Sequence, residues 1–204
     1  SALLVVIGAI GLSGISQTND ALKTVYEDRT VPMGQIAEIN RLNMQNRLLI
    51  AGSLLDPTPE EITKHTAKAE TNIANIATIW SAYVATTQTE EEAKLAKKLA
   101  ADRAQFVQEG LRPALAALRA NDLDSAKRIV LDKIRTLYVP VSAGIEALMQ
   151  LQLDVAKHEF DEATARYETI RWLAIGSILA GLLIAVLFGV ALIRGISRSL
   201  HHAV

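Results

Sequence analysis

Two uncharged apolar segments, one near each end of the chain, bracket a long polar middle. Residues 172–193 form a run of 22 residues without a charge. As a helix rising about 1.5 Å per residue, this run covers roughly 33 Å, enough to cross a bilayer core of about 30 Å. Residues 1–15 are also uncharged but shorter, and we interpret them as part of a first membrane span rather than as a signal peptide. The pattern predicts a sensor whose middle lies wholly on one side of a membrane.

In residues 16–171, apolar positions recur three, four or seven residues apart, the period of one buried helix face. Good helix formers are abundant, while the whole chain has only five prolines and no strand-like alternation. We therefore predict an all-α fold. Three apolar runs carry this prediction: Ile62, Ala69, Ile73, Ile76, Trp80 and Tyr83; Leu95, Leu99, Phe106, Gly110 and Ala114; and Ile145, Leu148, Gln152, Val155 and Phe160.

Residues that end or start helices divide the middle into four long helices joined by short breaks. A residue before proline leaves the α region, and a Thr followed three residues later by Glu forms a capping box. The predicted boundaries are Asp56-Pro57, the capping boxes Thr58/Glu61 and Thr89/Glu92, and Asn121-Asp122. The pattern predicts an up-down-up-down four-helix bundle whose first and last helices continue into transmembrane helices.

Prolines refine the first and last helices. Pro32 is expected to kink the first helix, because proline cannot join the hydrogen-bond ladder. Near the other end we expect a short helix over residues 123–134 and a separate last helix from about Thr136. Pro140 would then lie in the first turn of that last helix, where a missing N–H costs little.

Composition excludes several function classes. Residues 17–170 hold 18 basic and 22 acidic residues, a net charge of −4, which does not favour nucleic-acid binding. The chain has no cysteine and no common catalytic or phosphate-binding motif. Glu60-Glu61 and Glu90–Glu92 are expected to stabilise helix starts, and His201-His202 to form a solvated tail rather than a metal site. We therefore expect no enzyme, no cofactor and no metal.

Counting along the helices predicts which residues share a level in the bundle. Residue 15 to Arg47 is 32 residues, roughly 48 Å, and Tyr138 to Arg171 is 33 residues, roughly 50 Å. Arg47 and the start of the last helix should therefore lie at the same height, far from the membrane. By the same count Thr71 lies slightly lower, and Arg41 lies about two turns below Arg47.

The residues at this level predict a carboxylate site. Arg47, Arg135, Thr136 and Tyr138 would meet there, together with the free N–H groups that open the last helix. Guanidinium groups and a positive helix end both favour a planar anion. The alternative is that the arginines are surface residues, or that they pair with Asp132 and Asp56.

The chain also resembles the transmembrane sensor region of a bacterial methyl-accepting chemotaxis receptor, with a ligand-binding domain like that of the enteric aspartate receptor. Residues 26–36, the stretch Arg41-x-Asn43-x-x-x-Arg47, and residues 121–126 carry this resemblance. Residues 194–200 resemble the start of a HAMP domain, with Ser199 where that family usually has proline.

The resemblance implies four parts along the chain. These are a partial first transmembrane helix (1–15), a periplasmic four-helix-bundle ligand-binding domain (16–171), a second transmembrane helix (172–193) and the start of a HAMP domain (194–204). It implies a homodimer in the bacterial inner membrane that signals to cytoplasmic proteins through a following C-terminal region.

The resemblance also implies where a ligand binds. Arg41 or Arg47 would hold it from the first helix, with Asn43 nearby, and Thr136 and Tyr138 from the last. Arg135 suggests a ligand with several carboxylates, as in receptors for malate or citrate. The alternatives are an amino-acid chemoreceptor, the sensor of a histidine kinase or cyclic-dinucleotide enzyme, and a structural helical membrane protein.

Overall fold

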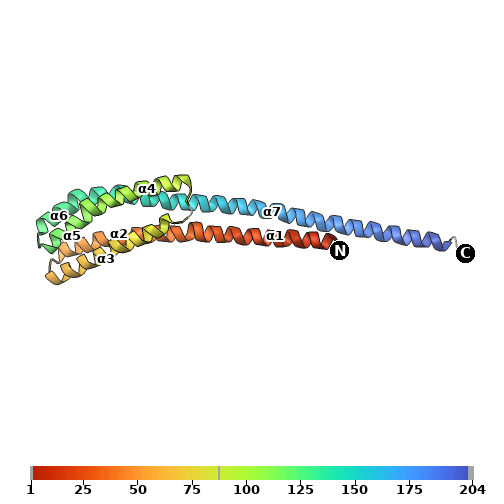
Figure 1. The fold of residues 1–204 in the computed structure, drawn as a ribbon, viewed down its shortest axis with the longest axis horizontal. Helices are drawn as coiled ribbons and strands as arrows, with labels where there is room; N and C mark the ends of the chain where they lie inside the picture. The colour runs from red at the N-terminus through yellow and green to blue at the C-terminus, as the bar shows by residue number, and fades with distance from the viewer. Residues whose placement is uncertain (1, 87, 202–204) are drawn as a thin grey trace. The chain divides into compact units, whose positions relative to one another are not determined.

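The computed structural model describes residues 2–86 and 88–201, and its account of side chains excludes residues 2–7, 10, 21, 24, 25, 28 and 195–201. Every regular element in the described residues is helical, which confirms the predicted all-α class (Figure 1). In chain order the elements, with η marking π-helical turns, are α1 (Ala2–Val25), η1 (Tyr26–Thr30), α2 (Val31–Leu55), α3 (Pro59–Val84), α4 (Glu90–Gln105), η2 (Phe106–Leu111), α5 (Arg112–Arg119), α6 (Leu123–Ile129), η3 (Val130–Ile134) and α7 (Arg135–His201).

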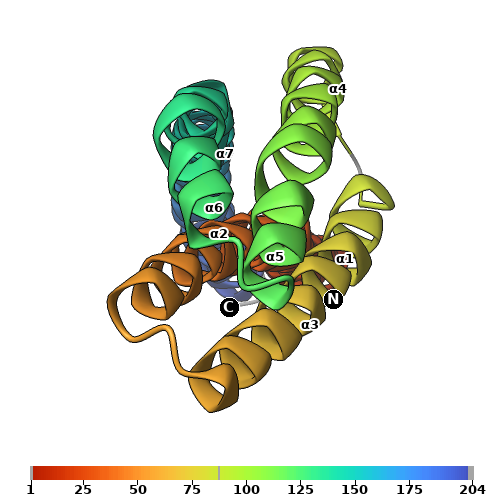
Figure 2. The same cartoon turned by 90° about the vertical axis from the view of Figure 1, so that its left-hand side faces the viewer.

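Contacts divide the chain into two compact units, Val25–Ala156 and the remainder, residues 1–24 with 157–204. The first unit is the bundle. Its rods are η1 with α2, then α3, then α4 through η2 into α5, and finally α6 through η3 into α7. The most extensive packing is between α2 and α3, and the next is between α5 and α6 (Figure 2).

The predicted helix starts are confirmed by side-chain caps. The hydroxyl oxygens of Thr58 and Thr89 each accept a hydrogen bond from the backbone N–H three residues later, at 3.4 and 3.2 Å. The Asp122 carboxylate does the same at 3.0 Å. Asn121 before it has φ +57°, a left-handed conformation that asparagine tolerates better than most residues. These caps fix where α3, α4 and α6 begin, because each satisfies an otherwise free N–H.

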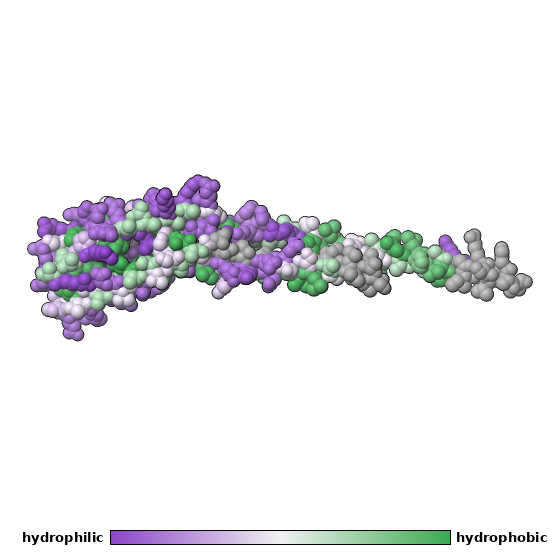
Figure 3. Space-filling model, in the orientation of Figure 1, coloured by the Kyte–Doolittle hydropathy of each residue, from purple (hydrophilic) through white to green (hydrophobic). Residues whose placement is uncertain are grey.

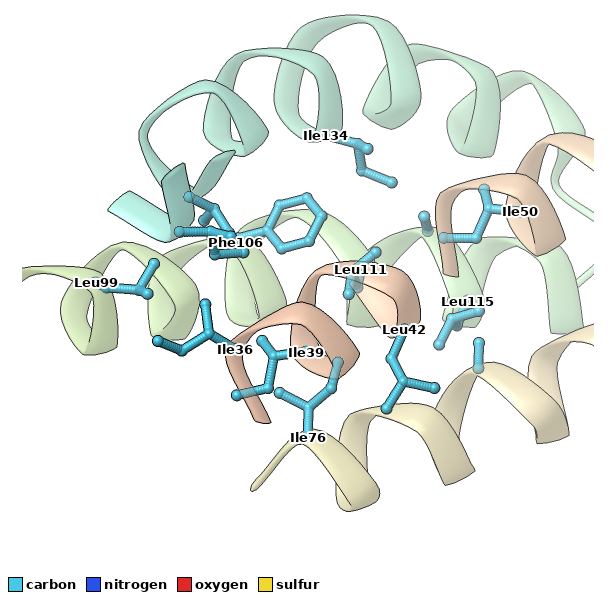
Figure 4. Packing of buried hydrophobic residues seen from close by; sticks show 14 of the residues in the cluster. Ile36, Ile39, Leu42, Ile50, Ile76, Leu99, Phe106, Leu111, Leu115 and Ile134 are labelled. Carbon is cyan, nitrogen blue, oxygen red and sulfur yellow. The ribbon is translucent and has the colours of Figure 1, made fainter. Parts of the chain in front are cut away.

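Apolar residues from all the rods form the core of the bundle. Figure 4 shows Ile36, Ile76, Phe106 and Ile134 converging from α2, α3, η2 and η3. The first two predicted runs contribute buried members, and the third does so as far as Gln152. Phe160, the last residue of that run, is 66% exposed and lies outside the bundle unit, so its assignment to the core is wrong.

A π-helical turn stands where the sequence suggests a break in the last helix. The N–H of Arg135 bonds to the carbonyl of Val130, five residues earlier, so α6, η3 and α7 continue into one another. The expectation of a separate helix from Thr136 is therefore wrong, and Pro140 lies inside α7 rather than in a first turn. The free N–H groups expected at that position do not exist.

The other π turns lie directly before prolines. Pro32 is the second residue of α2, after η1, and Pro113 is the second residue of α5, after η2. Proline donates no hydrogen bond to the carbonyl four residues earlier. In a π turn, a carbonyl accepts its hydrogen bond from the N–H five residues ahead. The carbonyl four residues before the proline can therefore bond to the residue after the proline. The expected irregularity at Pro32 is therefore accommodated in the preceding turn.

The second unit contains the apolar end of α7. Among the described residues, one helix is long and apolar enough to cross a membrane, and its most apolar window has a mean hydropathy of 2.6 and no buried residue. Figure 3 shows the hydrophobic colouring of this region, where residues 172–193 lie. Of the predicted first span, residues 1–15, residues 2–15 belong to α1, and most of the side chains before residue 11 lie outside the description.

Candidate functional site

Arg47 of α2 and Tyr138 of α7 are in direct contact in the bundle unit. The Cζ atom of Arg47 lies 4.1 Å from the centroid of the Tyr138 ring, which is a cation–π contact. The Tyr138 hydroxyl donates a hydrogen bond to Oδ1 of Asn40 at 3.3 Å, and its ring centroid lies 5.7 Å from that of Phe106. Tyr138 is thus held by both α2 and η2. The proximity of Arg47 and Tyr138 expected from the helix count is present.

Three polar residues of α2 line the same helix face. Asn40, Asn43 and Arg47 are spaced three and four residues apart, so their side chains lie above one another. Asn43 is only 2% exposed, and its Nδ2 has no hydrogen-bond acceptor in the described part of the chain. A buried amide without a partner is costly, but this Nδ2 is closed off from solvent, so the binding role of Asn43 stays a prediction.

Arg135 and Thr136 lie on the solvent-exposed side of the adjoining turn of α7. Within the described residues neither Arg47 nor Arg135 forms an ion pair, so the alternative pairing with Asp132 or Asp56 is absent there. A guanidinium without an acidic partner favours an anion, but the structure gives Arg135 and Thr136 no contact with Arg47 or Tyr138, and their binding role stays a prediction. The helix-end dipole expected to add to them is missing, since α7 continues from η3.

Arg41 and Thr71 are placed differently. The Nε and Nη2 atoms of Arg41 donate to both oxygens of Glu38, at 2.7 and 2.6 Å, and the bond lowers the pKa of that carboxyl. The Thr71 side chain is exposed, and its hydroxyl donates to the Ala67 carbonyl of its own helix at 3.0 Å. The structure gives neither residue a contact with Arg47 or Tyr138, and their binding role stays a prediction.

A buried amide cluster joins α2 to α3 beside this face. Nδ2 of Asn72 donates to Oδ1 of Asn46 at 2.9 Å and to Oε1 of Gln45 at 3.1 Å. Asn46 and Asn72 are fully buried. Since a one-residue slip would leave these amides unpaired, the cluster fixes the register of the two helices. Asn72 of α3 therefore contacts α2, whereas the predicted Thr71 beside it is exposed.

A second polar cluster, which we call the Glu92 network, is buried deep in the bundle. Oε1 of Glu92 accepts hydrogen bonds from the Tyr83 hydroxyl at 2.7 Å and from Nε2 of Gln152 at 2.6 Å. Its other oxygen lies 3.6 Å from Nη1 of Arg29. Glu92, Tyr83 and Gln152 are at most 1% exposed, and Arg29 is 7% exposed. One carboxylate therefore links η1, α3, α4 and α7.

Sequence reasoning did not identify the Glu92 network. The sequence predicts Glu92 as a helix-start residue, and its backbone N–H does take part in the Thr89 cap. The available signal was Gln152, a polar residue inside an otherwise apolar run, with Tyr83 at the end of another. A polar side chain at a core position requires a buried partner, and the partner here is a carboxylate.

The network makes the stability of the bundle sensitive to alkaline pH. Burial, and then the hydrogen bond to Glu92, raise the pKa of Tyr83 well above its ordinary value. Above about pH 10 the unfolded chain releases the phenolic proton and the folded chain keeps it, so stability falls as pH rises. Chemical denaturation between pH 8 and 11 should show a shallower fall for Tyr83→Phe than for the parent. Tyr26→Phe, at an exposed position, should keep the parental slope; equal slopes for all three proteins would contradict the assignment.

The described residues contain no group of three or more His, Asp or Glu side chains that could hold a metal ion. His65 instead joins two helices: Nδ1 lies 3.1 Å from the Ser53 hydroxyl of α2, and Nε2 lies 3.1 Å from the Glu61 carboxylate. The expected tail at His201-His202 lies outside the described side chains.

Comparison with known proteins adds independent information. The family model described as Tar ligand binding domain homologue matches residues 1–156. The methyl-accepting chemotaxis protein NahY of Pseudomonas putida is 28% identical over 200 residues, which cover 96% of this chain and 36% of that protein. The chain thus spans about a third of this relative's length. No solved structure matches the chain.

Proposed function

This chain belongs to the family of Tar ligand-binding-domain homologues, the sensor domains of bacterial chemoreceptors, and from this premise we propose that it binds a small di- or tricarboxylate against Arg47, Tyr138 and Arg135. The observation that carries the proposal is the Arg47–Tyr138 contact, in which a guanidinium without an acidic partner is held in place by an aromatic ring. The family and the apolar part of α7 indicate an inner-membrane protein; we further propose that the bundle faces the periplasm.

The chemistry of this face suits a carboxylate. A guanidinium offers parallel N–H donors that match the two oxygens of a carboxylate group. Exposed Arg135 supplies a second cation for a ligand with more than one carboxylate. Aspartate fits these residues less well, because Arg47, Tyr138 and Arg135 include no carboxylate that could bind its ammonium group.

We propose that the site is completed in a homodimer. Met44, Leu48 and Leu55 of α2 are 50%, 71% and 87% exposed, and they recur four and seven residues apart. Exposed apolar side chains aligned on one helix face are typical of a surface covered by another protein. A second copy packed on α2 would cover them and shield the neighbouring Arg47 from water.

Signalling would follow from the length of α7. Tyr138 and the apolar residues 172–193 belong to one uninterrupted helix. A ligand that bridges α2 and α7 and binds two positions of α7 with different affinity would shift the population between them. The output would pass through the residues from 194 onwards, which we propose to be the start of a HAMP domain, to cytoplasmic signalling proteins.

Thermal unfolding of the chain in lipid nanodiscs tests the proposed function. Malate, succinate, citrate, aspartate and acetate would each be added at increasing concentration. A ligand of the folded state at one hundred times its Kd stabilises by about 2.7 kcal/mol, so a di- or tricarboxylate should raise the unfolding temperature in a dose-dependent manner. If none of the acids raises it, the proposal is wrong; a larger effect of aspartate would favour an amino-acid receptor.

A further inference from the structure

A groove between α3 and the α4–η2 rod lies apart from the Arg47 face. It has a volume of about 250 Å³, and its walls are mostly apolar, including Ile73, Ile76, Trp80 and Val107. Its lining also contains two arginines, Arg103 and Arg112, and no acidic residue. All of these residues belong to the bundle unit.

Arg103 is the notable charge in this groove. Its Cζ lies 4.8 Å from the ring centroid of Trp80, and the described residues offer it no ion pair. Burial lowers the pKa of Arg103 to about 10. A partly buried guanidinium without a carboxylate partner is costly. A ligand carboxylate would supply the missing partner.

We propose that this groove is a second ligand site, which takes a monocarboxylate with a compact apolar body. The carboxylate would lie against Arg103 with Arg112 nearby, and the apolar body would lie against Ile76, Val107 and the free part of Trp80. Size is compatible, because an apolar cavity of about 150 Å³ accommodates benzene, which leaves room here for a ring and a carboxylate. A polar tricarboxylate would not suit these apolar walls.

Tryptophan fluorescence of the full chain in nanodiscs tests this site. The chain has two tryptophans, so a Trp172→Phe background leaves Trp80 as the only reporter. Benzoate and cyclohexanecarboxylate should each change its emission in a saturable manner. Acetate, which lacks the apolar body, and benzyl alcohol, which lacks the charge, should not. Absence of saturation with both acids up to millimolar concentration would overturn the proposal.

Variants in the same background assign the binding to the groove. Arg103→Met should weaken benzoate binding at least tenfold, and so should Ala104→Leu, which narrows the groove but keeps the arginine. The matched control is Arg119→Met, an arginine between α3 and α5 outside the groove, and it should keep the parental affinity. Arg47→Ala should keep it too. The second site would be rejected if both groove variants kept the parental affinity for benzoate, or if Arg47→Ala lost benzoate binding. Either result leaves the proposed site at Arg47 to be tested separately by the organic-acid series.

Discussion

Replacing Glu92 with leucine is expected to lower the free energy of unfolding of the bundle by about 3–5 kcal/mol. Arg29 would lose its buried carboxylate, and the Tyr83 hydroxyl and the Gln152 amide would lose their acceptor at the same time. The Tyr83 hydroxyl and the Gln152 amide are buried, and each buried donor left without an acceptor costs about 1–3 kcal/mol. Thermal or denaturant unfolding of the chain in nanodiscs measures the loss.

The adjacent Glu91 is the matched control for this experiment. Glu91 lies in the same first turn of α4 but is exposed. Glu91→Leu therefore removes the same interaction with the helix dipole without touching the network, and should cost under about 1 kcal/mol. The double variant Arg29→Met/Glu92→Leu removes both charges of the pair. Its loss of unfolding free energy should be smaller than the sum of the losses in Arg29→Met and Glu92→Leu. Equal losses for Glu91→Leu and Glu92→Leu would show that the network contributes nothing beyond the dipole.

Replacing Arg47 with alanine is expected to weaken binding of the organic acid by roughly ten- to 150-fold. This range corresponds to the loss of one hydrogen bond to a charged group, worth about 1.5–3 kcal/mol. Arg47→Lys keeps the charge but loses the paired donors, and should fall between the parent and alanine. Calorimetric titration with whichever acid raises the unfolding temperature measures the three affinities.

Substitutions of two other arginines test whether the loss of affinity is specific to Arg47. Arg119→Ala removes a surface arginine that bonds to Glu70 on the α3–α5 side, and should leave the affinity unchanged. Arg41→Ala distinguishes the two candidates on the first rod: because Arg41 is already bonded to Glu38, we expect a smaller loss than for Arg47→Ala. If Arg41→Ala proves to be the larger loss, Arg47 is not the principal ligand contact.

Local features of the fold were predictable because their causes are local. A threonine and the N–H that it caps are three residues apart, so the starts of α3 and α4 can be recognised in the sequence. The meeting of Arg47 with Tyr138 was also predictable, although the two are 91 residues apart, because helices rise by a constant amount per residue. Equal path lengths along neighbouring helices place residues at equal heights.

Features that depend on tertiary contacts were not predictable in the same way. The partners of Glu92 lie on three other rods, and its position in the Thr89 capping box suggests only a local role at the start of α4. The continuity of α6 into α7 was missed for a related reason. A π turn needs no particular residue. The sequence of residues 130–134 therefore does not show whether the helix ends there or continues through a wider turn.

A π turn changes which side of a helix the following residues face, because it takes up one extra residue. Ala126 precedes η3 and Ile134 is its last residue, and these two buried residues are eight positions apart. Ile134 and Val141, the next buried residue along α7, are seven positions apart. One additional residue in a regular α-helix would rotate everything beyond it by about 100°. By taking up that residue, η3 keeps Tyr138 facing α2 while Ala126 still faces the core. The direction in which Tyr138 and its neighbours on α7 point is therefore set by a single wide turn, independently of the length of the helix beyond it.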